Sequence, residues 1–264
     1  MRTYVRKNAW DRETSTEIQA VLSLLATGAS DYEIARRTGI PRSTVLNWRH
    51  GNIPGNPGSD ARCPRCGGGE HPHDELRVAP YAYLLGQYLG DGCLFQVGKA
   101  GFGLRISSDS AYPGIIGECC QAIEAVRGRR PYVYGYPDKR LSTITSYWRS
   151  WPCLFPQHGP GKKQNRMIAL SLWQVRIVEA DPGRFVRGLI HSDGWRGLNR
   201  VRVKGHAYEY PRYQFSSRSD DIRQLFVYAC ELLGVAWRPW GRYHVSVARR
   251  ESVELLDRFV GPKR

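Results

Sequence analysis

The sequence has few acidic residues for its length and no long apolar run. Only 24 Asp and Glu stand against 39 Lys and Arg in 264 residues, which leaves a net charge of +15. No apolar run approaches the roughly 18 residues that a membrane helix needs, and residues 1–11 lack the apolar stretch of a signal peptide. These absences argue against a membrane protein and predict a cytoplasmic, nucleoid-associated one.

Cysteine is also scarce. The seven cysteines are an odd number and too few for a disulfide scaffold, so they indicate reduced thiols or a metal site. At 41% apolar residues, the chain can bury one large core or two small ones. The positive surplus favours nucleic acid as the partner, ahead of an acidic membrane surface, while a merely soluble basic protein is the plain alternative.

A segment rich in Gly, Pro and Asn divides the chain. Residues 51–60 read GNIPGNPGSD, which can neither continue a helix nor fill a strand. Residues 1–60 carry a net charge of +2, which leaves +13 for residues 61–264. We therefore predict an N-terminal domain over 1–52, a linker over 53–79, and a larger region that carries most of the charge.

The N-terminal domain shows two helices joined by a tight glycine turn. Ser30 begins the first and Gly39 ends it, and Pro41 opens the second, which runs to Arg49. This pattern is typical of a DNA-binding helix-turn-helix, with a generic helical hairpin as the alternative. The second helix would contact DNA through five polar residues: Arg42, Ser43, Thr44, Asn47 and Arg49.

Two cysteines and two histidines follow in the linker. Cys63 and Cys66 are separated by two residues, as in structural Zn²⁺ sites, and His71 and His73 come next. The two histidines lie too close together for a well-spaced second ligand pair. A zinc knuckle and a linker with two free thiols both stay open.

The larger region contains an internal repeat. Residues 81–92 and 183–194 align without gaps, 102 residues apart. In each copy apolar residues lead to Gly86 or Gly188, a small residue follows four positions later, and Asp-Gly ends the motif. Further matches are residues 104–110 with 213–219, and Gly159-Pro-Gly-Lys-Lys163 with Gly261-Pro-Lys-Arg264. A tandem duplication explains these matches better than chance.

The repeated motif predicts two helices that cross closely, because small residues four apart let two backbones approach. The following glycines, Gly92 and Gly194, are expected in the left-handed turn that ends many helices. The crossing would bring Asp91 and Asp193 together at helix ends that already carry partial negative charge. Such a pair is unfavourable without a cation, and open oxygen ligation suits Mg²⁺ or Mn²⁺.

The segments between these helices alternate as strands. Arg200, Arg202 and Lys204 share one face of a strand, and Arg212 and Gln214 alternate with aromatic residues in the next. Sheets covered by helices on one side would then present a concave, positive surface that fits duplex DNA. For any single strand, a solvated face is the simpler interpretation.

At these residues the sequence resembles the LAGLIDADG homing endonucleases in their single-chain form with two motifs. The two copies are Leu84-Leu-Gly-Gln-Tyr-Leu-Gly-Asp91-Gly92 and Val186-Arg-Gly-Leu-Ile-His-Ser-Asp193-Gly194, and the resemblance spans about residues 80–264. It implies an α/β (α+β) fold, a pseudo-twofold duplicated αββαββα saddle with halves at 80–180 and 181–264. A small all-α helix-turn-helix domain precedes it here.

The resemblance also implies a site and an activity. Asp91 and Asp193 would be the catalytic ligands of Mg²⁺ or Mn²⁺, assisted by the carbonyls of Gly90 and Ser192. The family places basic residues near the scissile phosphates, which match Lys162 or Lys163 in the first half and Lys263 or Arg264 in the second. A lysine there would stabilise the charge of the transition state or polarise the attacking water. The implied function is site-specific, metal-dependent cleavage of duplex DNA by a monomer.

Two departures keep other functions open. His191 stands where the family consensus has an acid. The fused helix-turn-helix is similar to sporulation regulators whose endonuclease-like domain has lost its acids; here both acids remain, which favours cleavage over a non-catalytic transcriptional regulator. An RNA maturase on the same scaffold is the third candidate.

Overall fold

The computed structural model describes residues 15–50, 75–98, 101–203, 205–261 and 263. The chain divides into two compact units, Met1–Pro64 and Arg65–Arg264, which are considered separately below. Within the described residues, no helix combines the length and the apolar character that crossing a membrane requires.

Within residues 15–50, the first unit contains three helices, α1 (Ser15–Ala26), α2 (Asp31–Thr38) and α3 (Arg42–Arg49). The Ser30 hydroxyl accepts a hydrogen bond from the Glu33 N–H at 3.2 Å, so it caps α2 as predicted. Gly39 ends that helix with φ at 74°, a conformation that glycine adopts without strain. The helix-turn-helix is confirmed. Its core is small and apolar: Val21, Ile34, Ile40, Val45 and Trp48.

The second unit repeats one order of elements twice. The first copy comprises α4 (Val78–Asp91), β1 (Gly92–Val97), β2 (Gly101–Ser108), α5 (Pro113–Arg127), β3 (Tyr132–Tyr136), β4 (Leu141–Tyr147), the short α6 (Trp151–Leu154) and α7 (Leu172–Ala180). The second comprises α8 (Pro182–Asp193), β5 (Gly194–Val203), β6 (His206–Ser216), α9 (Asp220–Leu232), β7 (Arg238–Trp240), β8 (His244–Val247) and α10 (Arg250–Asp257). The predicted fold class, a duplicated αββαββα arrangement after a helical domain, is confirmed.

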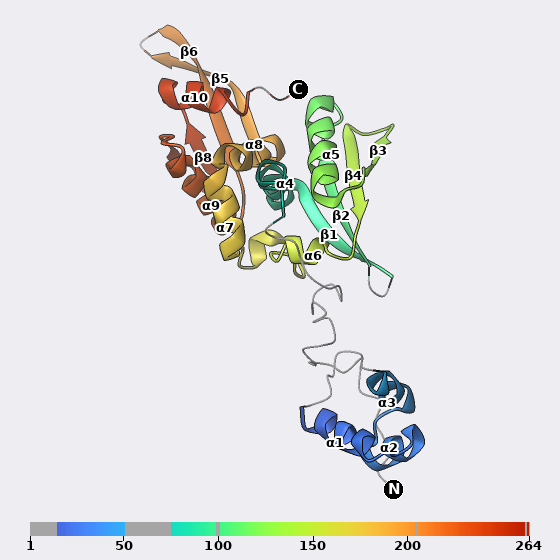
Figure 1. Ribbon diagram of the computed structural model, residues 1–264. Coiled ribbons are helices and arrows are strands. Elements are labelled where there is room, and N and C mark those ends of the chain that lie inside the picture. The colour runs from blue at the N-terminus through green and yellow to red at the C-terminus, as the bar shows by residue number, and fades with distance from the viewer. Residues whose placement is uncertain (1–14, 51–74, 99–100, 204, 262, 264) are drawn as a thin grey trace. The chain divides into compact units, whose positions relative to one another are not determined.

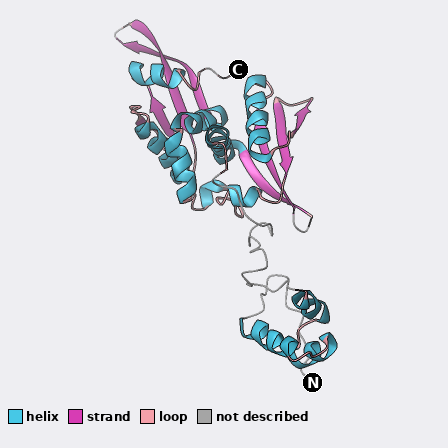
Figure 2. Ribbon diagram, in the orientation of Figure 1, coloured by secondary structure: helices cyan, strands magenta, loops and turns pink. Residues whose placement is uncertain are grey.

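Each copy forms one antiparallel sheet of four strands. The strand orders are β1-β2-β4-β3 and β5-β6-β8-β7, so the two sheets have equivalent topology. Ile106 lies opposite Ile144 in the first sheet and Phe215 opposite Val245 in the second, and all four side chains are buried beneath the helices. The sheets lie on either side of the paired helices α4 and α8 (Figures 1 and 2). Each sheet therefore keeps one helix-covered face and one open face.

The helices α4 and α8 cross at glycines, as the repeat predicts. A Cβ on Gly86 would lie 2.6 Å from the Phe185 carbonyl oxygen, and a Cβ on Gly188 only 2.2 Å from the Tyr83 carbonyl oxygen. Real Cβ atoms do not approach this closely, so no larger residue fits while the helices keep their separation. The close crossing is what places the ends of the two helices side by side.

The glycine after each acid differs from the sequence prediction. Gly92 and Gly194 have φ of −90° and −101° with extended ψ, so neither adopts the left-handed turn. The chain passes directly from α4 into β1 and from α8 into β5. Glycine is required there for space, because a Cβ would lie 2.5 Å from the Cα of Tyr88 or Ile190 in the preceding turn.

The second sheet separates two groups of basic residues that the sequence analysis placed on one surface. Arg196 lies opposite the buried Tyr213 and pairs with Asp257 of α10, on the helix-covered side. Side chains alternate along a strand, and the pairing is regular throughout β5 and β6. Arg200 and Arg202 therefore share the side of Arg196.

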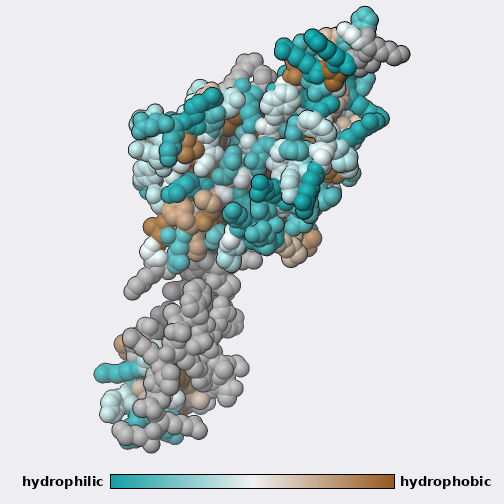
Figure 3. All heavy atoms as spheres, turned by 180° about the vertical axis from the view of Figure 1, so that it is seen from behind, coloured by the Kyte–Doolittle hydropathy of each residue, from teal (hydrophilic) through white to brown (hydrophobic). Residues whose placement is uncertain are grey.

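Arg212 and Gln214, the neighbours of Tyr213, point to the opposite, open face. The predicted single basic surface is wrong in this respect, because alternation within each strand leaves the phase between strands undetermined. Lys204 lies outside the described residues. On the face of the second unit seen in Figure 3, hydrophilic side chains cover most of the described surface.

Candidate active site

The two repeated acids occupy the last position of each central helix. Asp91 ends α4 and Asp193 ends α8. The Asp193 carboxylate oxygen lies 3.2 Å from the place that a Cβ on Gly90 would take, so the second acid abuts the end of the first helix. The duplication thus brings one carboxylate from each half to a common point.

The surroundings make both carboxyls harder to ionise. Burial and then the charge of Asp193 raise the pKa of Asp91 to about 6, and burial likewise raises the pKa of Asp193. Both side chains nevertheless keep contact with solvent. The pair is therefore crowded enough to be unfavourable yet open to a ligand from one side.

Two lysines lie at the ends of these helices. The Lys163 ammonium donates to the carbonyl oxygens of Gly90 at 2.9 Å and Gly92 at 2.6 Å, and also to that of Tyr88. The Lys263 ammonium donates to the Ser192 carbonyl oxygen at 3.1 Å. Each lysine thus satisfies orphan carbonyls and offsets the negative end of a helix dipole.

The lysines also supply countercharge to the acids. Burial has the largest effect on both carboxyl pKa values; among the lysines, Lys163 counters it most at Asp193 and Lys263 most at Asp91. Each lysine therefore caps the helix of its own half and acts mainly on the acid of the other half. Burial lowers the pKa of Lys163 to about 8, so this ammonium is still largely protonated at neutral pH.

The donor atoms of these residues suit a hard divalent cation. Two carboxylates and two backbone carbonyls are the oxygen donors that Mg²⁺ and Mn²⁺ prefer. Among the described residues, no group of three or more His, Cys, Asp or Glu gathers around one point. Mg²⁺ usually keeps several water ligands, so a cation held by Asp91 and Asp193 would have positions for water and phosphate oxygens. The carbonyls of Gly90 and Ser192 accept lysine hydrogen bonds here, but each retains a second lone pair.

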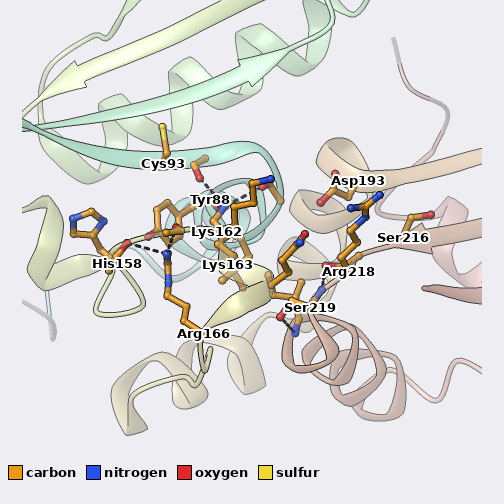
Figure 4. A pocket seen from close by; sticks show the side chains of 18 of the residues that line it. Tyr88, Cys93, His158, Lys162, Lys163, Arg166, Asp193, Ser216, Arg218 and Ser219 are labelled. Atoms are coloured by element: carbon orange, nitrogen blue, oxygen red, sulfur yellow. Dashed lines mark hydrogen bonds between the residues drawn. The ribbon is translucent and has the colours of Figure 1, made fainter. Parts of the chain in front are cut away.

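A cavity of about 720 Å³ opens beside this site (Figure 4). Asp193 lines it, whereas Asp91 does not. Lys163, the first residue of a short 3-10 helix (Lys163–Asn165) before α7, lines it, as does the more exposed Lys162. His158, which from the sequence could contact phosphate but is more simply a surface loop histidine, lines the cavity, and the sequence analysis missed several other polar lining residues: Arg166, Ser217, Arg218 and His244. The repeat offered a signal for one of them: Arg218 follows the Ser-Ser that both copies share, at the position equivalent to Asp109.

The raised pKa of Asp91 predicts a pH-dependent penalty on the fold. Asp91 in the folded state holds its proton up to about pH 6, whereas an ordinary Asp loses it near pH 3.8. The stability that comes from the protonated form is therefore fully present below pH 4 and is lost as the pH rises to 6. We expect Asp91→Asn to raise the free energy of unfolding at pH 7 by about 1 kcal/mol, after discounting the shift for solvent screening. Urea unfolding at pH 4 should give no such gain.

Asp109→Asn is the matched control. Hydrogen bonds from the Ala111 N–H and from Arg140 lower the pKa of Asp109, so its removal should reduce stability at pH 7. A loss of stability in Asp91→Asn at pH 7 would contradict the proposed strain at the acid pair.

His191 is a core residue. Its side chain is buried, with Nδ1 3.0 Å from the Tyr83 hydroxyl oxygen, and burial and Arg187 lower its pKa to about 4. It is neutral at physiological pH, so it does not supply the negative charge of the acid that the family consensus has at this position. The departure noted in the sequence therefore leaves the acid pair intact.

The predicted contacts of the helix-turn-helix are unequally placed. Arg42 is exposed and Thr44 is half-buried on α3. Arg49 donates to the Asp31 carboxylate and to the Ala29 carbonyl oxygen, both at 2.6 Å, so it ties α3 to the start of α2. Ser43 and Asn47 lie on α3, and their side chains are outside the described part of the unit.

On the open face of the second sheet, Arg212 is held among aromatic rings. Its guanidinium lies 5.0 Å from the ring centre of Trp240 and 5.6 Å from that of Tyr210. The Gln214 side-chain amide Nε2 donates to His244 Nδ1 at 2.9 Å. The candidate zinc ligands Cys63, Cys66, His71 and His73 lie outside the described residues, as does Arg264.

Comparison with known proteins gives two kinds of match. The family model of the homeodomain-like domain matches residues 12–56. No curated protein matches the chain significantly.

Several solved structures are similar to the chain at low identity. Variants of the homing endonuclease I-DmoI are 13% identical, with a TM-score of 0.45 over 70% of this chain and 96% of theirs. I-DmoI in complex with DNA and Ca is 13% identical, with a TM-score of 0.47 over 70% and 91%. The I-LtrWI LAGLIDADG homing endonuclease bound to target DNA is 9% identical, with a TM-score of 0.45 over 70% and 85%. The chain thus resembles LAGLIDADG homing endonucleases over 70% of its length and carries a homeodomain-like match at residues 12–56.

Proposed function

We propose that this protein is a site-specific DNA endonuclease that hydrolyses phosphodiester bonds in duplex DNA with a divalent cation, Mg²⁺ or Mn²⁺. The observation that carries the proposal is the meeting of Asp91 and Asp193 at two abutting helix ends, with Lys163 and Lys263 beside them. Two carboxyl groups with raised pKa values, lying beside ammonium groups, form an arrangement that binds a cation and a phosphate together.

Each group has a distinct role in the proposal. Asp91 and Asp193 hold the cation, which when bound would polarise a phosphate and lower the pKa of water. Lys263 donates a hydrogen bond to a phosphate oxygen where negative charge develops during hydrolysis, and Lys163, whose three N–H groups are given to backbone carbonyls, stabilises that charge by its own positive charge. Lys162, exposed at the margin of the cavity, holds the DNA backbone by its charge rather than contacting the reacting phosphate.

The duplex would lie along the open faces of the two sheets. Arg212 and Gln214 project from the open face of the second sheet, and residues 61–264 carry +13 of the net charge. Both acids belong to one chain, so the proposed enzyme acts as a monomer, with halves at 80–180 and 181–264. The helix-turn-helix adds a second DNA contact through Arg42 and its neighbours on α3.

Binding and cleavage are tested in sequence. Full-length protein in EDTA selects duplexes from a random pool, and the selected duplex is then placed in a supercoiled plasmid and incubated with Mg²⁺, Mn²⁺ or neither. We expect nicking or linearisation only with the metal. A selected plasmid that is bound tightly but stays intact in both metals would contradict the proposal.

One observation favours a second candidate, a transcriptional regulator without chemistry. Lys163 and Lys263 already place two positive charges beside the two acids, so the fold has countercharge for the pair without a cation. The plasmid experiment separates the two, and tighter binding of structured RNA than of the selected duplex would indicate the maturase instead.

A further inference from the structure

The two lysine-bearing segments are each held in place by an arginine that donates to backbone carbonyls. One segment is residues 157–163, and the other is residues 258–261 with Lys263, after α10. In both, a glycine with positive φ stands two residues before the lysine: Gly161 at 75° and Gly261 at 67°. Both segments therefore place a glycine in the left-handed region shortly before the lysine.

Arg166 holds the first segment. Its Nη1 donates to the carbonyl oxygens of Gly159 at 2.8 Å and Gly161 at 2.7 Å, with a longer contact to Pro160 at 3.3 Å. Its Nε donates to the Gln157 carbonyl oxygen at 3.2 Å. One planar guanidinium thus gathers four carbonyls of the loop, and this fixes the direction in which the chain reaches Lys163.

Arg187 of α8 holds the second segment. Its Nη1 donates to the carbonyl oxygens of Phe259 at 2.9 Å and Val260 at 2.5 Å. Its Nε and Nη2 face the Glu118 carboxylate, with distances of 2.6 to 2.9 Å. The arginine is itself oriented by this bidentate pair, because the fork geometry of guanidinium matches a carboxylate.

We call each arginine with the backbone carbonyls that it holds a clamp. The second clamp, that of Arg187, joins the two halves of the unit. Glu118 lies on α5 of the first half, whereas Arg187 and the segment it holds belong to the second. The lysine of the second half is therefore positioned by a carboxylate of the first. Arg166, by contrast, acts within its own loop.

We infer that Arg166 and Arg187 are positioning residues, which set Lys163 and Lys263 against the helix ends by holding the backbone that precedes each lysine. Only the purpose of the two lysines depends on the proposed endonuclease function. The clamps themselves can be tested on the free protein.

The test measures how fast each lysine of the full-length protein reacts with an amine-labelling reagent, read by peptide mass spectrometry. Arg187→Gln should raise the labelling rate of Lys263 by about threefold or more and leave Lys163 at the wild-type rate, because only one segment opens. Arg166→Gln should do the reverse. Lys139, in an exposed turn, serves as the internal reference for reagent and exposure time.

Arg184→Gln is the matched control for the second clamp. Arg184 also pairs with Glu118, at 2.9 Å, but among the described residues it is Arg187, not Arg184, that donates to the Phe259 and Val260 carbonyl oxygens. Its loss should leave Lys263 labelling unchanged. Unchanged labelling of Lys263 in Arg187→Gln, or equal increases at both lysines, would overturn the inference, since equal increases indicate general loosening.

Cleavage provides the second readout. If Arg187 acts through Lys263, then Arg187→Gln combined with Lys263→Met should cleave no more slowly than Lys263→Met alone. Losses that multiply would overturn the positioning role. If the wild-type protein cleaves no DNA, the proposed function fails, while the labelling result still decides whether the clamps exist.

Discussion

Asp193→Asn is expected to lower the rate of DNA cleavage by about a thousandfold while leaving duplex binding intact. Asparagine keeps the size of the side chain but removes its charge, so the pair can no longer hold a divalent cation. The carboxylate lies at the cavity and beside the end of α4, where a phosphate would also carry negative charge. Binding of the selected duplex should therefore be equal or slightly tighter in low salt.

The measurement is single-turnover cleavage of the selected duplex with saturating protein and Mg²⁺, together with a binding titration in EDTA. Asp181→Asn is the control on the same helix. Asp181 caps the start of α8 by accepting the Arg184 N–H at 2.9 Å, and asparagine caps helices equally well. A cleavage rate within a few-fold of wild type in Asp193→Asn would remove this carboxylate from the mechanism.

Gly188→Ala is expected to lower the free energy of unfolding by at least about 3 kcal/mol. The added Cβ would lie 2.2 Å from the Tyr83 carbonyl oxygen and 3.0 Å from the Gly86 Cα, and both neighbours are backbone atoms. The helices α4 and α8 must therefore separate or tilt, which also moves Asp193 away from Asp91. Cleavage should fall together with stability.

Gly117→Ala tests whether the cost comes from the crossing. Gly117 lies within α5, and nothing stands within 4 Å of the place its Cβ would take. Alanine there should raise stability by about 0.5–1 kcal/mol, because glycine is the poorer helix former. Urea unfolding of both variants at pH 7 gives the comparison, and wild-type stability in Gly188→Ala would contradict the close crossing.

The repeat made the centre of the fold predictable. Small residues four apart and a terminal Asp-Gly appear in both copies. The small residues predict a close crossing of the two helices, and the Asp-Gly predicts where each helix ends. The boundaries of α2 were equally predictable, because Ser30 caps its start and Gly39 ends it through contacts with residues only a few positions away. Such features depend on a few neighbouring residues, which a sequence displays directly.

Features that depend on the relation between segments were less predictable. Alternation in β5 and β6 was visible, but whether Arg200 and Arg212 share a face depends on pairing register, which separates them. Arg49 had the position of a DNA contact, yet Asp31 lies within its reach only after the helices pack. Arg166 lies in no motif, and Arg187 lies within the second repeat motif where the first copy has Leu85, so neither was marked as a positioning residue. An arginine that binds backbone carbonyls needs only a segment of the right shape.

The sequence by itself determined that the chain is duplicated, where its central helices cross, and that one acid ends each of them, because these properties are written in local residue size and spacing. Tertiary structure alone decided that Lys163 and Lys263 cap the helix ends beside the acids, that Gly92 and Gly194 are needed for space rather than for a left-handed turn, and that Glu118 of one half orients Arg187 of the other. The lysine contacts and the Glu118–Arg187 pair join atoms about 70 residues apart, and only packing brings such atoms together. The two glycines are needed for space because each helix passes directly into a strand, which brings the glycine against the preceding turn.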